Sequence, residues 1–193
     1  MSDDSKTNVF PPNAEASANA HVSSLEQYRE IYDRSINDPD GFWTEHAERL
    51  CWDEKWHTLR ESNYSKAEIK WFIGGKLNAC YNCVDRHVDN GHGDDTALIW
   101  EGNDPNESRT YTYSQLQVEV QKAANALKDL GIGKGDRVCI YMQMIPELTI
   151  AMLACARIGA VHSVVFGGFA ANELAVRIDD AQPKVCLLYT SPS

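Results

Sequence analysis

The clearest periodic pattern in the chain lies between residues 112 and 131. Apolar residues there recur at spacings of four, three, four and three, at Leu116, Val120, Ala123, Leu127 and Leu130. This spacing places them on one face of a helix. Thr112-Tyr-Ser-Gln115 has the spacing of a capping box, and Gly131 suits a C-terminal stop. The pattern predicts an amphipathic helix between these two signals.

The next segments alternate between apolar runs and a helical pattern. Residues 137–142 and 160–166 are apolar runs of strand length, and residues 146–158 between them have helical spacing. Pro146 suits the first turn of that helix, and Gly159 suits its end. The second run is apolar on both faces, which is typical of a parallel strand covered by helices. We therefore predict an α/β fold class with a parallel strand–helix–strand unit.

The first 95 residues predict helices and loops. Residues 1–23 are polar, alanine-rich and aperiodic, so we expect a disordered tail. A second capping-box spacing, Ser24-Leu-Glu-Gln27, predicts a helix start. Further short helices are expected at residues 41–50 and 77–88.

A hairpin is expected after a turn-rich cluster. Residues 89–95 combine Asp, Asn and Gly and indicate a subdomain boundary. Residues 96–101 and 109–112 then have strand character and flank a polar loop. This arrangement predicts two antiparallel strands.

Composition and charge narrow the class of protein. The 193 residues are 43% hydrophobic and 24% charged, as expected for a globular chain. A formal net charge of −10 argues against nonspecific nucleic-acid binding. The sequence shows no membrane-length apolar run, secretory signal or transit peptide. Six cysteines, three of them in apolar runs, suit a reducing compartment. We expect a cytoplasmic protein with neither nucleic-acid nor membrane partners.

The glycine pair after the second predicted strand is the best candidate for a binding site. In an open α/β sheet, ligands bind where parallel strands end and the next helix begins. Gly167 and Gly168 lack a Cβ, so the backbone there can lie against a ring or a phosphate. The alternative is a tight turn that serves packing alone.

One cluster of cysteine and histidine residues is considered as a zinc site. Cys80 and Cys83 have metal-ligand spacing, but His87 and His92 follow too closely for a zinc finger. On a helix, the two cysteines and His87 share a face, which suits simple burial. We expect no metal here.

Two further polar features are interpreted as structural. His162 lies within the predicted buried strand without a nucleophile pattern, so we expect a hydrogen-bonded core histidine. Asp85, Arg86 and His87 are expected to tie the N-terminal segment to the main domain through ion pairs.

Four stretches together resemble one family: Ser35–Trp43, Asn78–Val88, Ala97–Glu101 and Met152–Phe169. In order and spacing they resemble the N-terminal part of the AMP-forming acetyl-CoA synthetases, which are acetate–CoA ligases of the adenylate-forming enzymes. The likeness covers about residues 24–185.

The resemblance implies a domain organisation. Residues 24–90 correspond to an irregular helical extension that packs on the first part of an adenylate-forming domain. Residues 91–185 correspond to the start of that AMP-binding domain. Within residues 186–193, Leu188-Tyr-Thr-Ser191 mimics the opening of the family's phosphate loop, but the glycines that should follow are absent. We expect these last residues to be foreign to the family.

The resemblance also implies a reaction. Acetate and ATP with Mg²⁺ give acetyl-adenylate and pyrophosphate, and the thiol of coenzyme A then releases AMP. The family's phosphate loop, acetate pocket and catalytic lysine are expected beyond residue 193, so we assign no catalytic residue and expect the isolated chain to be inactive. Phe166, Gly167 and Gly168 are implied as part of the wall that holds the adenine of coenzyme A.

Two alternatives to acetate–CoA ligase stay open at this point. One is a propionate–CoA ligase, because the carboxylate pocket is not in view. The other is a non-catalytic regulatory or interaction module built from this portion of the fold.

Overall fold

A computed structural model describes residues 11–104 and 106–189 of the chain. The expected disordered tail therefore lies partly outside the described residues (1–10), as do the last four residues of the expected foreign tail (190–193). The chain divides into two compact units. The first unit runs up to Leu50 and also contains Leu59–Trp71. The second unit contains Cys51–Thr58 and the chain from Phe72 onward.

The first unit holds three helices, α1 (Ala14–Ala18), α2 (Leu25–Asn37) and α3 (Pro39–Ala47). The helix predicted at 41–50 begins earlier, because Pro39 suits a first turn and the Asp38 side chain caps it by accepting from the Gly41 amide at 3.0 Å. The short α1 lies within the segment predicted to be disordered. Asn13 caps it, and it buries no residue.

Two strands, most of whose residues belong to the first unit, were not expected from the sequence. β1 (Thr58–Asn63) and β2 (Glu68–Ile73) form a two-stranded sheet joined by the short helix η1 (Tyr64–Lys66). β1 contains a single apolar residue, Leu59, and so carries no alternating apolar signal. Residues 68–71 of β2 do alternate between polar and apolar types, and the sequence interpretation missed that signal.

The second unit contains the predicted parallel sheet. Its strands are β5 (Arg137–Met142), β6 (Val161–Phe166) and β7 (Val185–Leu188), in the order β6-β5-β7. Both pairings are parallel. The helix α5 (Pro146–Ile158) connects β5 to β6, and α6 (Ala171–Ala181) connects β6 to β7. The predicted α/β fold class and strand–helix–strand unit are confirmed, and part of the tail expected to be foreign (residues 186–188) pairs with β5.

The predicted hairpin and its following helix are also present. β3 (Thr96–Glu101) and β4 (Ser108–Thr112) pair antiparallel, and α4 spans Tyr113–Asp129. The capping box is complete, because the Gln115 amide donates to Thr112 Oγ1 at 3.2 Å and the Thr112 amide donates to Gln115 Oε1 at 2.9 Å. The predicted helix at 77–88 is underwound, with the π-helical segments η2 (Tyr81–Asp85) and η3 (Val88–His92).

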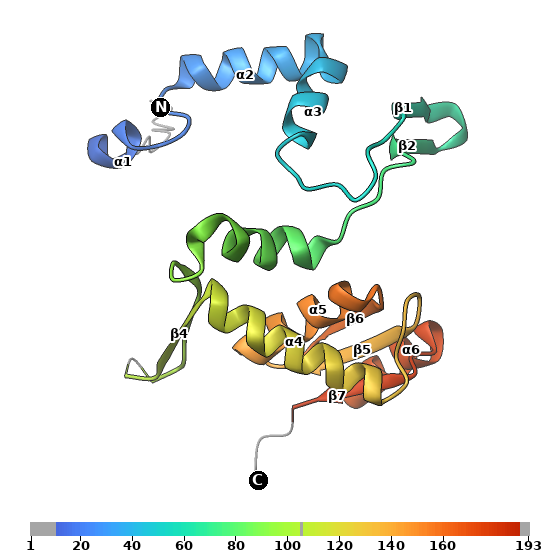
Figure 1. The fold of residues 1–193 in the computed structure, drawn as a ribbon. Coiled ribbons are helices and arrows are strands. Elements are labelled where there is room, and N and C mark those ends of the chain that lie inside the picture. The colour runs from blue at the N-terminus through green and yellow to red at the C-terminus, as the bar shows by residue number, and fades with distance from the viewer. Residues whose placement is uncertain (1–10, 105, 190–193) are drawn as a thin grey trace, which may run out of the picture. The chain divides into compact units, whose positions relative to one another are not determined.

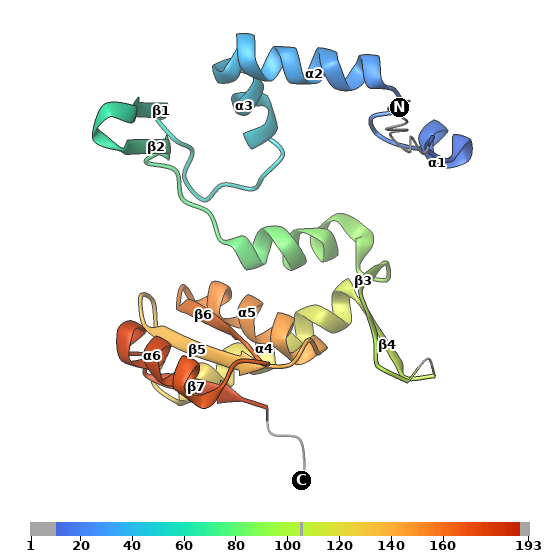
Figure 2. The same cartoon turned by 180° about the vertical axis from the view of Figure 1, so that it is seen from behind.

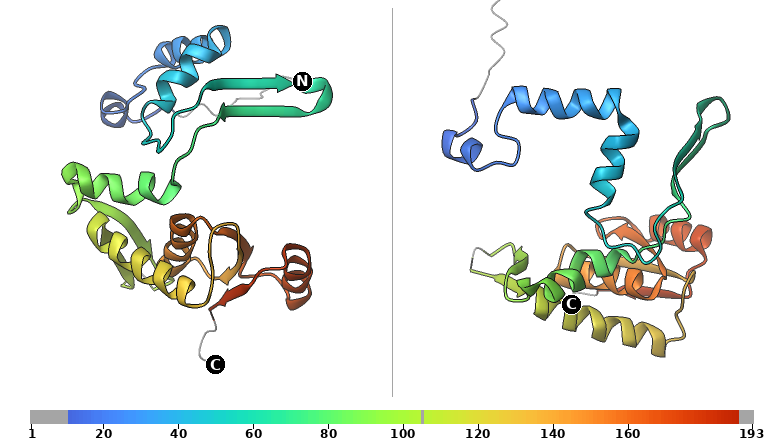
Figure 3. Two further views of the ribbon diagram at one scale, coloured as in Figure 1. Left: turned by 45° about the vertical axis from the view of Figure 1, so that its right-hand side comes forward. Right: turned by 45° about the horizontal axis from the view of Figure 1, so that its top comes forward.

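The core of the second unit lies between the sheet and its helices. Figures 1 and 2 show α4 on one side of the sheet and α6 on the other, and Figure 3 shows α5 beside α4. The buried core cluster comprises Cys80, Val84, Leu116, Val120, Ala124, Leu127, Ile132, Val138, Ile140, Leu148, Ile150, Ala151, Ala154, Cys155 and Ala160. Among the described residues, no helix is long and apolar enough to cross a bilayer.

The central strand and its neighbour differ in burial. β5 lies between two strands and buries three consecutive residues, whereas β6 has a partner on one side within the described sheet. Val161, Val164 and Phe166 of β6 are exposed. The expectation of a strand buried on both faces is therefore wrong for β6, because its apolar pattern does not reveal which strand is central.

Candidate functional site

The candidate site lies where β5 and β6 end together. Met142 and Phe166 are register partners at the ends of the two parallel strands. A Cβ built on Gly167 would lie 2.8 Å from the backbone oxygen of Met142. Any side chain there would push the two backbones apart, so the close approach requires glycine.

The three predicted residues share one wall of a cavity of about 480 Å³. The cavity is lined by Met142, Gln143, Met144, Leu148, Val164, Val165, Phe166, Gly167 and Gly168. Within the described part of the chain, this lining contains no charged side chain. Such a surface can hold a flat, apolar-faced group, but phosphate groups would need donors from other residues.

Aromatic contacts hold the turn after the glycines. The rings of Phe166 and Phe169 meet edge to face at 5.6 Å, and the Tyr141 hydroxyl donates to the Phe169 carbonyl oxygen at 2.7 Å. The Arg177 guanidinium lies 4.7 Å from the Phe169 ring centre. Phe166 is 64% exposed and remains free to contact a ligand.

A second cavity of about 550 Å³ shares Gln143 and Met144 with the first. Arg109 on its wall bonds both carboxylate oxygens of Glu147, at 2.6 and 3.1 Å. The bond from Arg109 lowers the pKa of Glu147, and the pair raises the pKa of Arg109. Trp100 Nε1 donates to the Met144 carbonyl oxygen at 2.7 Å.

The sequence interpretation missed these supporting residues. Two signals could have found them. An indole N–H needs a partner when its ring packs in a hairpin strand, as Trp100 does. An acidic residue in a first helical turn, such as Glu147 after Pro146, indicates a local electrostatic role.

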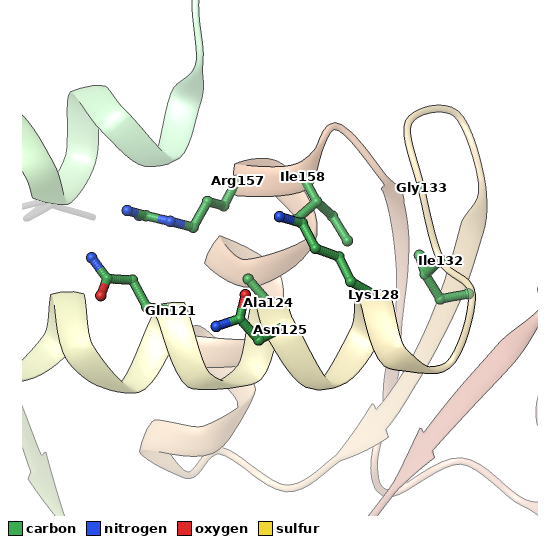
Figure 4. Close-up of a pocket in the computed structure, with 8 residues that line it drawn as sticks. All are labelled: Gln121, Ala124, Asn125, Lys128, Ile132, Gly133, Arg157 and Ile158. Carbon is green, nitrogen blue, oxygen red and sulfur yellow. The ribbon is translucent and has the colours of Figure 1, made fainter.

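A cavity of about 610 Å³ lies at the opposite edge of the sheet (Figure 4). It involves the C-terminal ends of α4 and α5, with Lys128 and Arg157 beside it, and Gly133 leads into the start of β5. Ligands in parallel sheets bind at the other edge, where strands end. This cavity is therefore not the preferred site.

A buried ion pair anchors η2 to α5. Arg157 bonds both oxygens of Asp85, at 2.8 and 2.6 Å, and Gln117 Nε2 donates to Asp85 at 2.9 Å. Burial alone would raise the pKa of Asp85, but the bonds from Arg157 and Gln117 hold it below its usual value. Of the cluster predicted to form ion pairs, Asp85 does so, whereas His87 stacks on Tyr113 with ring centres 4.6 Å apart.

The residues considered for zinc do not converge. Cys80 is buried, and burial raises its thiol pKa, whereas Cys83 is exposed. His92 Nδ1 lies 2.8 Å from Asp95 Oδ2. Among the described residues, no group of three His, Cys, Asp or Glu side chains is arranged to hold a metal ion.

His162 differs from its expectation. It is half-buried on β6 rather than enclosed in the core, because β6 has a strand neighbour on one side within the described sheet. Its strand position was predicted correctly, but its burial was not.

Comparison with known protein families identifies the class of protein. Residues 84–192 match the profile of the AMP-binding enzyme family, and the chain belongs to that family. Residues 28–83 match a second profile, described as the acetyl-coenzyme A synthetase N-terminus.

The chain is also similar to individual proteins named acetyl-coenzyme A synthetase. The chain is 51% identical over 184 residues to the acetyl-coenzyme A synthetase of Halorhodospira halophila. This alignment covers 95% of the chain and 28% of that relative. The chain is 52% identical over 184 residues to the one from Magnetococcus marinus, with the same coverage. The chain thus spans about 28% of the length of these curated relatives.

Proposed function

We propose that this chain forms the N-terminal portion of an AMP-forming acetate–CoA ligase. The observation that carries the proposal is the identity of about half of 184 aligned residues to acetyl-coenzyme A synthetases. The likeness runs through both the N-terminal profile and the AMP-binding profile.

The proposed reaction has two steps. Acetate attacks the α-phosphorus of ATP, and pyrophosphate leaves, giving acetyl-adenylate. The thiol of coenzyme A then attacks the acyl carbon, and AMP leaves. Mg²⁺ would neutralise charge on the ATP phosphates. We attribute these phosphate contacts to parts of the relatives that this chain does not span.

The role proposed for the described residues is to hold part of coenzyme A. Phe166, Gly167 and Gly168 form an apolar wall that fits the face of an adenine ring. The uncharged lining supports a site for the ring rather than for the phosphates. A packing role for Gly167 is compatible with this proposal, since the same close approach that excludes a Cβ also shapes the cavity wall.

We propose the domain organisation and location that follow from this function. The N-terminal extension covers residues 24–90 and the adenylating domain begins at 91. The change from one family profile to the other between residues 83 and 84 supports a division in this region. The proposed location is the cytoplasm, where acetate, ATP and coenzyme A are all available.

An acetate–CoA ligase is preferred over the two alternatives, a propionate–CoA ligase and a non-catalytic module. Both relatives compared above carry the name acetyl-coenzyme A synthetase, which favours acetate over propionate. Identity at about half of 184 aligned residues favours a ligase over a regulatory module.

A chimera tests the proposal. This chain would replace the aligned segment of the Halorhodospira halophila relative. Two reactions would then be measured: acetate-dependent exchange between ATP and pyrophosphate, and acetyl-CoA formation. We expect the chimera to catalyse both reactions. A folded chimera that catalyses neither would contradict the proposal.

The site is tested in the same chimera by Phe166→Ala. Loss of ring stacking is expected to raise the KM for coenzyme A about tenfold, while the exchange reaction, which needs no coenzyme A, is retained. Val161→Ala is the matched control, because Val161 is an exposed apolar residue at the other end of β6. Equal losses in both reactions would indicate a packing role instead.

A further inference from the structure

The segment that faces the glycine turn has no regular structure of its own. Residues 143–145 connect the end of β5 to the start of α5. The Ile145 amide donates to the Gln143 carbonyl oxygen at 2.9 Å. Gln143 and Met144 line both cavities at this edge, so the conformation of this segment determines the wall between them.

The β3–β4 hairpin holds this segment at one point and the first turn of α5 at another. Trp100 and Arg109 are cross-strand partners in the hairpin, and the Arg109 guanidinium lies 4.7 Å from the Trp100 ring centre. Trp100 Nε1 donates to the Met144 carbonyl oxygen at 2.7 Å, and Arg109 binds Glu147 through two bonds. The two anchored residues lie on either side of Pro146, whose ring fixes its own backbone φ.

We propose that Trp100 and Arg109 are positioning residues for the candidate coenzyme A site. They act through residues 143–147 and fix the wall that faces Phe166 and Gly167. This inference rests on the proposed function of that site. Neither residue touches the cavity of about 480 Å³ that the glycines line.

A positioning role is distinct from a role in overall stability. Arg109 and Glu147 are 39% and 45% exposed at their side chains, and ion pairs this exposed contribute little to folding. Trp100 and Arg109 are also absent from the buried core cluster of the second unit. Each makes a polar contact with a residue between 144 and 147, beside the site, so their loss should affect ligand binding more than unfolding.

The test uses the whole chain, labelled with ¹⁵N, and coenzyme A as the probe. Trp100→Phe removes the indole N–H but keeps a ring for Arg109, and Glu147→Gln weakens the second anchor at constant shape. Trp56→Phe is the matched control, since its ring packs on Trp52 and Phe72. Chemical shifts of the amides of residues 166–169 report binding, and urea unfolding reports stability.

We expect Trp100→Phe to weaken coenzyme A binding about tenfold, which corresponds to about 1.4 kcal/mol and to the loss of one hydrogen bond. Glu147→Gln should weaken binding in the same direction, and both variants should speed hydrogen exchange at the amides of Met144 and Ile145. The urea midpoints of both variants, and all properties of Trp56→Phe, should stay near those of the parent chain.

The outcomes separate the two proposals. If coenzyme A leaves the amides of residues 166–169 of the parent chain unchanged, the proposed site fails and this inference fails with it. If the parent chain binds and both variants bind equally well, only the positioning role is overturned. If Trp100→Phe does not fold, the result for Glu147→Gln decides the question.

Discussion

The two units contain helices with similar sequence signals, but these helices differ in how much of their surface is buried. Both α2 and α4 begin with a side-chain cap and carry apolar residues at helical spacing. α4 buries Leu116, Val120, Ala124 and Leu127, whereas α2 buries no residue. One arginine–carboxylate pair from each unit can also be compared: Arg34–Glu45 in the first unit is exposed, whereas Arg157–Asp85 in the second is largely buried. An amphipathic pattern therefore predicts a helix, but not whether its apolar face is covered.

The ion pairs give the largest expected difference between the units. Asp85→Ala would leave Arg157 largely buried without its carboxylate partner, and we expect a loss of about 3 kcal/mol in the free energy of unfolding. Glu45→Ala, which removes the exposed partner of Arg34, should cause no measurable change. Urea unfolding followed by circular dichroism measures both. Equal effects of the two substitutions would remove the distinction between the units.

The apolar faces should differ by a slightly smaller amount. Leu127→Ala opens a cavity in the core beneath α4 and is expected to cost about 2.5 kcal/mol. Leu25→Ala on α2 removes a side chain that is 56% exposed, and its effect should stay within about 0.5 kcal/mol. The same unfolding measurement applies. A large effect at Leu25 would show that the face of α2 is covered in solution.

The helix caps give the smallest contrast. Thr112→Ala removes one half of the complete capping box of α4 and should cost about 1 kcal/mol of global stability. Ser24 also caps its helix, accepting from the Gln27 amide at 3.1 Å, but Gln27 Oε1 accepts from the Ser23 amide instead of completing the box. Ser24→Ala should therefore fray α2 locally without moving the global transition. Hydrogen exchange of the two first turns distinguishes these results.

Local signals in the sequence were sufficient to predict where many helices and strands of the second unit begin and end. The capping box at Thr112, the proline at 146 and the glycine at 159 each act over a few residues, and each appears where it was predicted. Gly159 adopts a φ of +73°, which is the left-handed conformation expected of a helix stop. Signals of this kind depend on nearby backbone groups and need no knowledge of distant contacts.

Features that depend on distant partners could not be predicted in the same way. The burial of Val164 depends on where β6 lies in the sheet, and the pairing of Asp85 with Arg157 joins residues 72 positions apart. The same limit applies to the site. The glycine turn was identified from its local pattern, whereas the contribution of Trp100 depends on a bond to Met144 across 44 positions.

Residues 59–71 belong to the first unit although the chain on both sides of them belongs to the second, and this has a practical consequence. The chain leaves and re-enters that unit at neighbouring points, because the His57 amide donates to the Ile73 carbonyl oxygen at 3.0 Å and Glu54 pairs with Lys76. A closed stem of this kind makes the distal turn at Tyr64–Lys66 a natural place to graft an epitope, a fluorophore or a purification handle. A label at that turn would leave β5, β6 and β7 of the parallel sheet uninterrupted.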